Sequence, residues 1–318
     1  MDVIRHIRSH PRRFAAPVLT LGNFDGVHCG HQAIFECVVA EARRLGGEAV
    51  AMTFEPHPLT ILHPERPPAV LTALRDKLAL IAATGIDVLV LQHFTRAFAR
   101  IEAEAFVERF VVGRLHAAKL VVGHRVSFGH GRRGNAAMLR ELGARLGFAV
   151  EVVGPVRVDA HEVSSSRIRR AVAAGDMRLA ATLLGRPHRV GGRVVPGKQR
   201  GAALGFPTAN IDVAGSMVPP DGVYAVVAET PGGAYPGIAN IGHNPTFGEN
   251  ARTLEVHLFD FQGDLYGQRC DVAFIERLRG EIAFPSAEAL AAQIRRDAEH
   301  VRSVLTARGV AVAPGARS

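Results

Sequence analysis

The hydrophobic and polar positions in the first half of the chain follow two alternating periods. Runs rich in Val, Leu and Ile predict buried strands, and between them apolar residues recur with helical spacing. The predicted strands cover residues 17–22, 48–54, 87–92, 118–123 and 149–153, and the predicted helices cover residues 31–45, 72–84, 102–114 and 135–146. Strands that alternate with helices predict a parallel sheet covered on both faces.

The pattern changes near residues 185–187. Before this point, residues 164–184 predict two short helices that part near Gly175 and Asp176. After it, short β-like runs separated by Gly, Pro, Asn and Asp predict a small antiparallel barrel, at residues 188–195, 222–228, 235–241, 254–259 and 269–275. An amphipathic helix follows from about Ser286. We therefore expect one domain at residues 1–185, a second at 186–310, and a loose tail at 311–318.

The composition and charge of the chain limit the kinds of partner that we expect. The 318 residues carry a formal net charge of +8, from 38 Lys and Arg against 30 Asp and Glu. Only three of the cations are Lys, the Arg residues are scattered, and Trp is absent, so we expect no nucleic-acid partner, although a basic nucleic-acid-binding protein remains an alternative.

The predicted cellular compartment rests on features that the sequence lacks. No run is long enough to span a membrane, and the N-terminal residues have no apolar core typical of a secretory signal. Cys29, Cys37 and Cys270 form no CxxC pair, so neither a disulfide framework nor a zinc site is expected. We predict a cytoplasmic protein with no membrane partner.

The candidate chemistry of the first half begins at residues 22–31, GNFDGVHCGH, between a predicted strand and a predicted helix. Free backbone N–H groups and the helix dipole favour an anion at such a junction. His28 and His31 are three apart and therefore share a helix face, where two imidazoles could stabilise charge on phosphate oxygens.

Three further segments are placed to line the same site. In residues 53–58, TFEPHP, Phe54 could stack on a planar ring and His57 could donate a hydrogen bond. After the fourth strand, Phe128 could pack on a ring in the same way. Residues 163–169, VSSSRIR, precede a helix, and their hydroxyls and arginines could hold phosphate. Read alone, TFEPHP is equally consistent with a turn that ends a strand, and the three serines are more typical of a helix cap and loop.

The second half carries a different constellation. Residues 192–198 imitate a P-loop, but Gln199 stands where a Ser or Thr should hold Mg²⁺ and no helix follows, so we reject that reading. The surrounding segment still predicts a loop that covers phosphate, with Gly197, Lys198 and Gly201. In an extended segment Thr208 and Asn210 face one side, and their oxygens suit Mg²⁺.

Strand alternation at residues 254–258, LEVHL, places Glu255 on the face opposite Leu254 and Val256. Read alone, this residue is more typical of a solvent-facing carboxylate on a half-exposed strand.

In the first half, the order GNFDGVHCGH, TFEPHP, VVG…SFG and VSSSRIR resembles the nucleotidyltransferase module of bacterial bifunctional riboflavin kinase/FAD synthetases. In the second half, LGFPTANI, DGVYA, NIGHNPTFG, EVHL and DLYG resemble the flavokinase family. The resemblance implies a Rossmann-like α/β nucleotidyltransferase domain followed by a flavokinase β-barrel. It implies that ATP phosphorylates riboflavin to FMN and then adenylylates FMN to FAD, with Mg²⁺ as cofactor.

The resemblance also implies roles for individual residues. Glu255 is the candidate general base, Thr208 and Asn210 are the Mg²⁺–ATP ligands, and His28 and His31 contact ATP phosphates. The remaining residues expected at the phosphates of the first site are Gly22, Asn23, Asp25, Gly26, Ser164, Ser165, Ser166 and Arg169.

One departure and two questions stay open. At residues 125–126 the chain has Arg-Val where the family has Asp or Asn followed by Phe, so the first domain could have an altered adenylylation activity. An adenylyltransferase with another acceptor would explain the histidines but would leave the second half unused. The oligomeric state is open, a homo-oligomer included.

Overall fold

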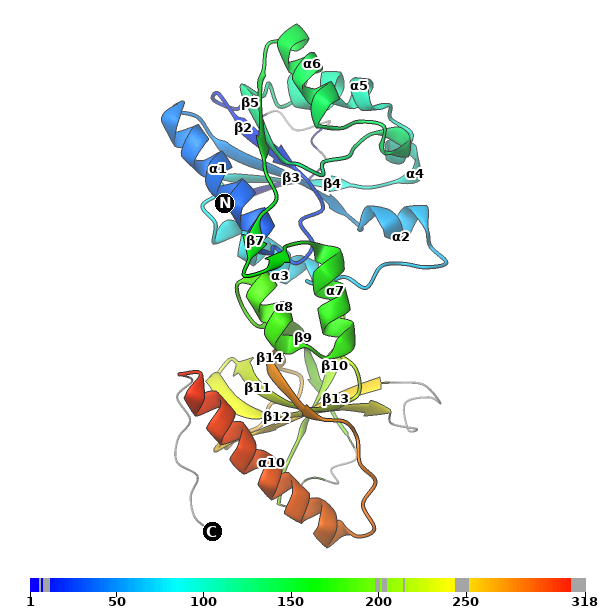
Figure 1. Cartoon of the computed structure of the whole chain (residues 1–318), viewed down its shortest axis with the longest axis vertical. Helices are drawn as coiled ribbons and strands as arrows, with labels where there is room; N and C mark the ends of the chain where they lie inside the picture. Colours follow the sequence, from blue (N-terminus) through cyan, green and yellow to red (C-terminus); the bar gives the residue numbers. More distant parts are fainter. Residues whose placement is uncertain are drawn as a thin grey trace. The chain divides into compact units, whose positions relative to one another are not determined.

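The computed structural model describes residues 1–5, 7, 12–197, 201, 205–213, 215–243 and 252–309. The chain forms two compact units (Figure 1), one of residues 1–70 and 74–165 and one of residues 71–73 and 166–318. Helices α7 (Ser165–Ala174) and α8 (Met177–Leu184) fall almost wholly in the second unit. The predicted domain boundary at residue 185 stays a prediction.

The first unit is built on a six-stranded parallel sheet with the order β1-β4-β3-β2-β5-β6. Its strands are β1 (Asp2–Arg5), β2 (Val18–Leu21), β3 (Ala49–Glu55), β4 (Val88–His93), β5 (Lys119–Gly123) and β6 (Ala149–Val153). The parallel α/β architecture predicted from the sequence is confirmed. The edge strand β1 was not predicted, because only Ile4 of its four residues is buried and no alternation is visible.

The strand order reverses between β2 and β5. From β2 the chain moves outward through β3 and β4 on one side, and later through β5 and β6 on the other. A crevice therefore opens at the carboxyl ends of β2 and β5, which is where open α/β sheets bind ligands.

Helices cover both faces of this sheet. On one face, α1 (Cys29–Arg44) and α3 (Leu74–Ala82) pack Phe35, Val38 and Ile81 against alternate strand residues. On the other face, α5 (Ala103–Phe106), the π-helical turn η2 (Val107–Val112) and α6 (Ala136–Leu146) cover the intervening positions. Strand residues buried in both directions explain the nearly continuous apolar runs of the sequence.

Short elements complete the first unit and were not predicted. They are α2 (Pro58–Leu62), α4 (Arg96–Ala99), the 3₁₀ turn η3 (His130–Arg132), and the two-residue strands β7 (Arg157–Val158) and β8 (His161–Glu162). The predicted helix 102–114 is split between α5 and η2.

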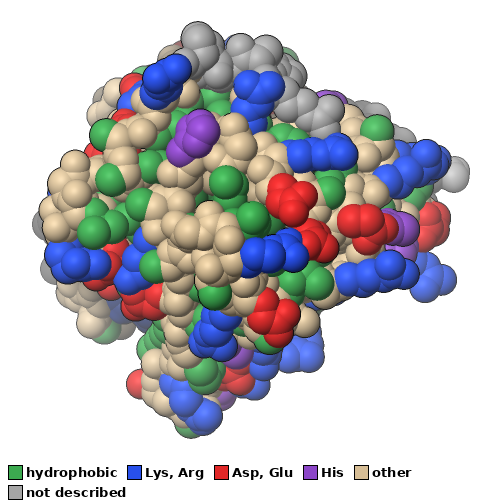
Figure 2. Space-filling view, turned by 90° about the horizontal axis from the view of Figure 1, so that it is seen from above, with side chains coloured by type: hydrophobic (Ala, Val, Ile, Leu, Met, Phe, Trp, Pro, Cys, Tyr) green, Lys and Arg blue, Asp and Glu red, His purple; other side chains and the backbone are tan. Residues whose placement is uncertain are grey.

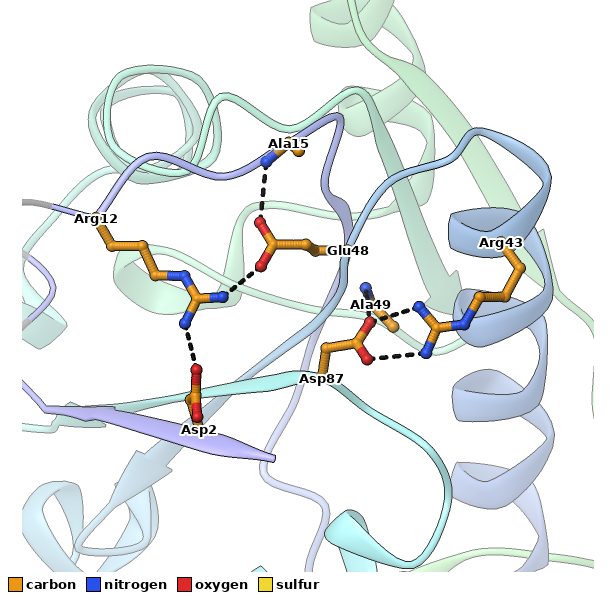
Figure 3. A network of polar contacts seen from close by, with 7 residues as sticks. All are labelled: Asp2, Arg12, Ala15, Arg43, Glu48, Ala49 and Asp87. Atoms are coloured by element: carbon orange, nitrogen blue, oxygen red, sulfur yellow. Dashed lines mark hydrogen bonds and ion pairs between the residues drawn. The ribbon is translucent and has the colours of Figure 1, made fainter.

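The amino-terminal edge of the sheet is held by ion pairs (Figure 3). Arg12 pairs with both Asp2 and Glu48. Arg43 donates two hydrogen bonds of 2.8 Å to Asp87, whose carboxylate also accepts from the Ala49 N–H. These contacts join β1, α1 and the starts of β3 and β4, at the edge opposite the crevice.

The second unit is a closed antiparallel barrel with the strand order β10-β13-β12-β11-β14-β9. The strands are β9 (His188–Val195), β10 (Ala209–Val213), β11 (Gly222–Thr230), β12 (Gly233–His243), β13 (Arg252–Leu258) and β14 (Arg269–Arg279). The predicted barrel is confirmed, with β10 as the strand that the sequence reading missed. The expected tail at residues 311–318 lies outside the described residues.

Helix α10 (Ala287–Ala307) packs on the barrel through Val301 and Leu305, which contact Val223 and Ile275 in one apolar cluster. Its N-cap is Ser286, whose hydroxyl accepts from the Ala289 N–H. A largely buried ion pair also ties the helix down, since the Arg279 guanidinium donates to both oxygens of Asp297.

Candidate active sites

The first candidate site is the loop between β2 and α1, at the crevice of the sheet. Gly26 has φ of +92°, and the loop also places Phe24 and Val27 at φ of +50° and +40°, a region that side chains rarely adopt. Such backbone persists only where its surroundings enforce it, and it is commonly found at ligand-binding sites. The predicted strand–turn–helix junction is confirmed.

Four hydrogen bonds hold this loop in place. The Gly22 N–H donates to Met52 O at 3.1 Å, and the buried Thr53 hydroxyl donates to Asn23 O at 3.1 Å. The Ser165 hydroxyl donates to Asp25 O at 2.9 Å. The Gln32 side chain donates to Val27 O at 2.8 Å. Because these bonds occupy carbonyl oxygens of the loop, its conformation is set before a ligand arrives.

His28 and His31 stack on each other, with ring centroids 3.6 Å apart and planes 16° apart, as the three-residue spacing predicted. His28 is the N-cap of α1, and its Nδ1 accepts from the His31 N–H at 3.3 Å. An accepting Nδ1 assigns the proton of the neutral ring to Nε2, which is then a donor. Phe24 lies edge-on to His31, with centroids 5.3 Å apart.

Two of the three predicted flavin contacts belong to an aromatic cluster. Phe54 lies 5.9 Å from Phe98, which continues through Phe106 to Phe128. Phe128 is 7% exposed and its ring fills the space beside Gly134, so it is part of the core. His57 is the N-cap of α2, where its Nδ1 accepts from the Leu59 N–H at 3.2 Å. Their roles toward flavin stay predictions.

The segment of residues 163–169 lies at the start of α7. Ser164 and Ser165 belong to the first unit, and Ser165 is tied to the phosphate loop. Ser166 and Arg169 belong to the second unit, and their roles stay predictions. At the departure from the family pattern, Arg125 pairs with Glu162 at 2.8 Å, while Val126 packs on the apolar core.

The second candidate site is a row of polar side chains on three neighbouring barrel strands. Asn210 of β10 pairs with Glu255 of β13, which in turn pairs with Asn240 of β12. Directly paired residues project to the same face, roughly 5 Å apart at Cβ. The burial of Leu254 and Val256 confirms that Glu255 lies on the opposite face.

Asn240 was missed in the sequence reading. The alternation of residues 235–241 could have found it, since buried Ala239 and Ile241 flank it.

Glycines let the chain approach this row closely. A Cβ on Gly197 would lie 2.0 Å from Asn210 Nδ2 and 2.7 Å from its Oδ1. A Cβ on Gly201 would lie 2.3 Å from Phe206 O. The predicted phosphate-covering glycines are therefore packed against Asn210 of β10 and against Phe206, which precedes that strand, while Lys198 lies outside the described residues.

Asn210 is the residue best suited to hold a cation. It is 7% exposed, and its Oδ1 has no hydrogen-bond partner among the residues that the structure describes. A buried amide oxygen without a donor costs free energy unless a ligand satisfies it. Thr208, two residues before it, is half-buried and adds a second hard oxygen donor.

His257 of β13 contacts the segment that precedes β10. Its Nδ1 lies 2.9 Å from Pro207 O, so the ring donates there, and its ring meets Phe206 edge-on at 5.5 Å. Burial lowers the pKa of His257, which keeps the ring neutral near pH 7.

Two absences concern only the residues that the structure describes. Among them no group of three or more His, Cys, Asp and Glu is arranged to hold a metal ion. The helices of the same ranges include none with the length and apolarity needed to cross a bilayer. On the face shown in Figure 2, basic and acidic side chains are interspersed with hydrophobic ones.

Family comparison matches the two halves of the chain to two different families. Residues 11–167 match the FAD synthetase family and residues 184–305 match the riboflavin kinase family. The bifunctional riboflavin kinase/FMN adenylyltransferase of Haemophilus influenzae is 40% identical, covering 95% of this chain and 99% of its own length. That of Bacillus subtilis is 37% identical, with 89% and 90% covered.

A solved structure shares the whole architecture. A crystal structure titled as a macrolide-efflux protein from Streptococcus pneumoniae superposes with a TM-score of 0.86 at 31% identity, covering 95% of this chain and 99% of that one. With both halves matched in order and nearly full-length relatives at 40% identity, this chain belongs to the family of bifunctional riboflavin kinases/FMN adenylyltransferases.

Proposed function

We propose that this chain makes FAD from riboflavin in two steps, each with its own set of residues. The barrel unit transfers the γ-phosphate of ATP to riboflavin and gives FMN. The α/β unit transfers the adenylyl group of a second ATP to FMN, giving FAD and pyrophosphate. The observation that carries the proposal is the presence of both families, in order, on one chain.

In the kinase step, Glu255 accepts the proton of the ribityl 5′-hydroxyl as that oxygen bonds to the γ-phosphorus and the bond to ADP breaks. Thr208 and Asn210 fit a magnesium ion, because both supply oxygen and the buried Asn210 Oδ1 accepts from no donor within the described ranges. Such an ion neutralises charge on the triphosphate when bound. Gly197 and Gly201 bring the covering loop close to these ligands.

In the adenylyl step, a phosphate oxygen of FMN attacks the α-phosphorus of ATP and pyrophosphate leaves. This step needs no proton transfer, so the protein contributes position and charge stabilisation. The backbone of residues 22–28 and the N-terminus of α1 receive the phosphates, and the Nε2–H of His28 donates to an oxygen that gains charge. Ser164, Ser165, Ser166 and Arg169 are proposed to bind phosphate as well.

The test is product analysis on the full chain. With riboflavin, ATP and Mg²⁺, chromatography should show FMN followed by FAD, and FMN supplied alone should give FAD. Glu255→Gln should slow FMN formation by roughly 10²–10⁴ and spare FAD formation from FMN. His28→Ala should do the reverse, by on the order of 10²–10³.

Two results would refute the assignment. Unchanged FMN formation in Glu255→Gln removes that residue as the base. Equal loss of both activities in either variant points to unfolding instead of chemistry.

The same experiment decides the alternatives that the sequence left open. An adenylyltransferase for another acceptor would form no FMN, and a chain altered at Arg125 and Val126 would stop at FMN. The cytoplasmic location, the absence of a nucleic-acid partner and the oligomeric state stay predictions.

A further inference from the structure

Lys77 is a buried cation that neither reaction step above uses. It lies on α3, and the residue is 6% exposed. Lysine is almost never buried unless its charge is paired. Its environment is therefore informative about what its ammonium does.

Two carboxylates from the active-site edge of the sheet face this ammonium. The Lys77 Nζ lies 3.7 Å from Oε2 of Glu55, the last residue of β3. Asp25, which is 3% exposed in the phosphate loop, is the other charge acting on it. Burial lowers the pKa of Lys77, and both carboxylates oppose that lowering.

The ammonium of Lys77 offsets negative charge at the site where ATP is proposed to bind. ATP brings a polyanion to a loop that contains the buried carboxylate of Asp25, and the partly exposed carboxylate of Glu55 lies at the end of the neighbouring strand β3. Without the ammonium, the charge of Asp25 would repel the triphosphate with little screening, because it is buried, and the charge of Glu55 would add a weaker, partly screened repulsion. Even across about 12 Å, one unit charge changes a binding constant about tenfold at an effective dielectric constant of about 20.

We propose that Lys77 is a positioning residue of the adenylyl-transfer site, whose ammonium neutralises Asp25 and Glu55 so that the loop of residues 22–31 can receive the triphosphate of ATP. The inference rests on the proposed function of the first unit. It assigns to Lys77 an effect on ATP binding, which a merely structural ion pair would not have.

The test is Lys77→Met in the full chain, with FMN-to-FAD conversion followed as a function of ATP concentration. We expect the KM for ATP to rise at least about tenfold. Riboflavin phosphorylation should keep its KM and kcat, because that site lies on the barrel. Adding Glu55→Gln removes one of the two carboxylates that Lys77→Met leaves without the ammonium, so the double variant should recover part of the lost ATP affinity.

Lys119→Met is the matched control. Lys119 is also partly buried and bridges two carboxylates, Glu41 and Glu151, but it begins β5 at the opposite edge of the sheet. Its removal should lower the unfolding midpoint without raising the KM for ATP. If Lys77→Met behaves in the same way, the ion pair is structural and the proposal is overturned.

A second comparison covers the case in which Lys77→Met does not fold. Lys77→Met/Glu55→Gln is then compared with Glu55→Gln alone, where the ammonium still neutralises Asp25. A KM for ATP at least about threefold higher in the double variant supports the proposal, and equal values overturn it. Failure of the proposed function would look different, since the unsubstituted enzyme itself would then form no FAD from FMN.

Discussion

Gly197→Ala should disable the kinase site while leaving the barrel folded. The added Cβ would lie 2.0 Å from Asn210 Nδ2, whereas ordinary contact begins near 3.4 Å. The group that must move is a side-chain amide, so the backbone of β10 can stay in place. To restore ordinary contact, Nδ2 of Asn210 must move by about 1.4 Å (from 2.0 to 3.4 Å), and this movement of the amide carries its Oδ1 away from the place where it would bind the metal.

A misplacement of about 1 Å at a reacting site can cost on the order of 10²-fold in rate. We therefore expect kcat/KM for riboflavin phosphorylation to fall about 10²-fold, with a higher Mg²⁺ concentration needed for half-maximal rate. The assay is FMN formation at varied Mg²⁺ and ATP, alongside FMN-to-FAD conversion in the same preparation, which should be unchanged.

Gly280→Ala is the control within the barrel unit. Its Cβ would lie 4.0 Å from the nearest side-chain atom, Arg277 Nη2, and its backbone does not have positive φ. This variant should keep full kinase activity. A Gly197→Ala enzyme within about threefold of the unsubstituted one would refute the reasoning, because the Asn210 amide would then not need the position that the structure gives it.

Three further predictions address the fold around the two sites. Thr53→Val removes the donor to the carbonyl oxygen of the half-buried Asn23, so FAD formation should fall about tenfold at a stability cost of about 1 kcal/mol, as measured by turnover and denaturant unfolding. Asp297→Ala leaves Arg279 buried and unpaired, and urea unfolding should show a loss of about 3 kcal/mol. The folded pKa of His257 lies below its unfolded value of about 6.5, so its contribution to stability is complete above about pH 6.5 and is lost as the pH falls toward the folded pKa. In His257→Phe, the free energy of unfolding should therefore depend less steeply on pH over this range. An unchanged pH dependence would show that His257 is not its cause.

The sequence was sufficient to predict features that depend only on residues close together in the chain. The Gly-rich turn after a run of Val and Leu, with histidines three apart, is enough to place two imidazoles on one helix face. The Leu-Glu-Val-His-Leu alternation is likewise enough to separate Glu255 from the core. These predictions need only the periods of helix and strand, which are fixed by backbone geometry.

Tertiary structure decided what depends on partners distant in the chain. Strand β1 exists because β4 supplies its hydrogen bonds, and β10 because β9 and β13 do. The row of Asn210, Glu255 and Asn240 comes from the pairing of three strands, and no spacing in the sequence contains that register.

Lys77 is the clearest case of such dependence. On the sequence it is one polar position of a helix, and only the closing of α3 over the sheet removes its ammonium from water and brings it to Glu55. The sequence itself contains the residue types and their helix or strand periods, whereas burial and charge pairing arise from contacts between segments. The electrostatic free energy of a charged group depends on the solvent and the charges around it, and this environment forms only when the chain has folded.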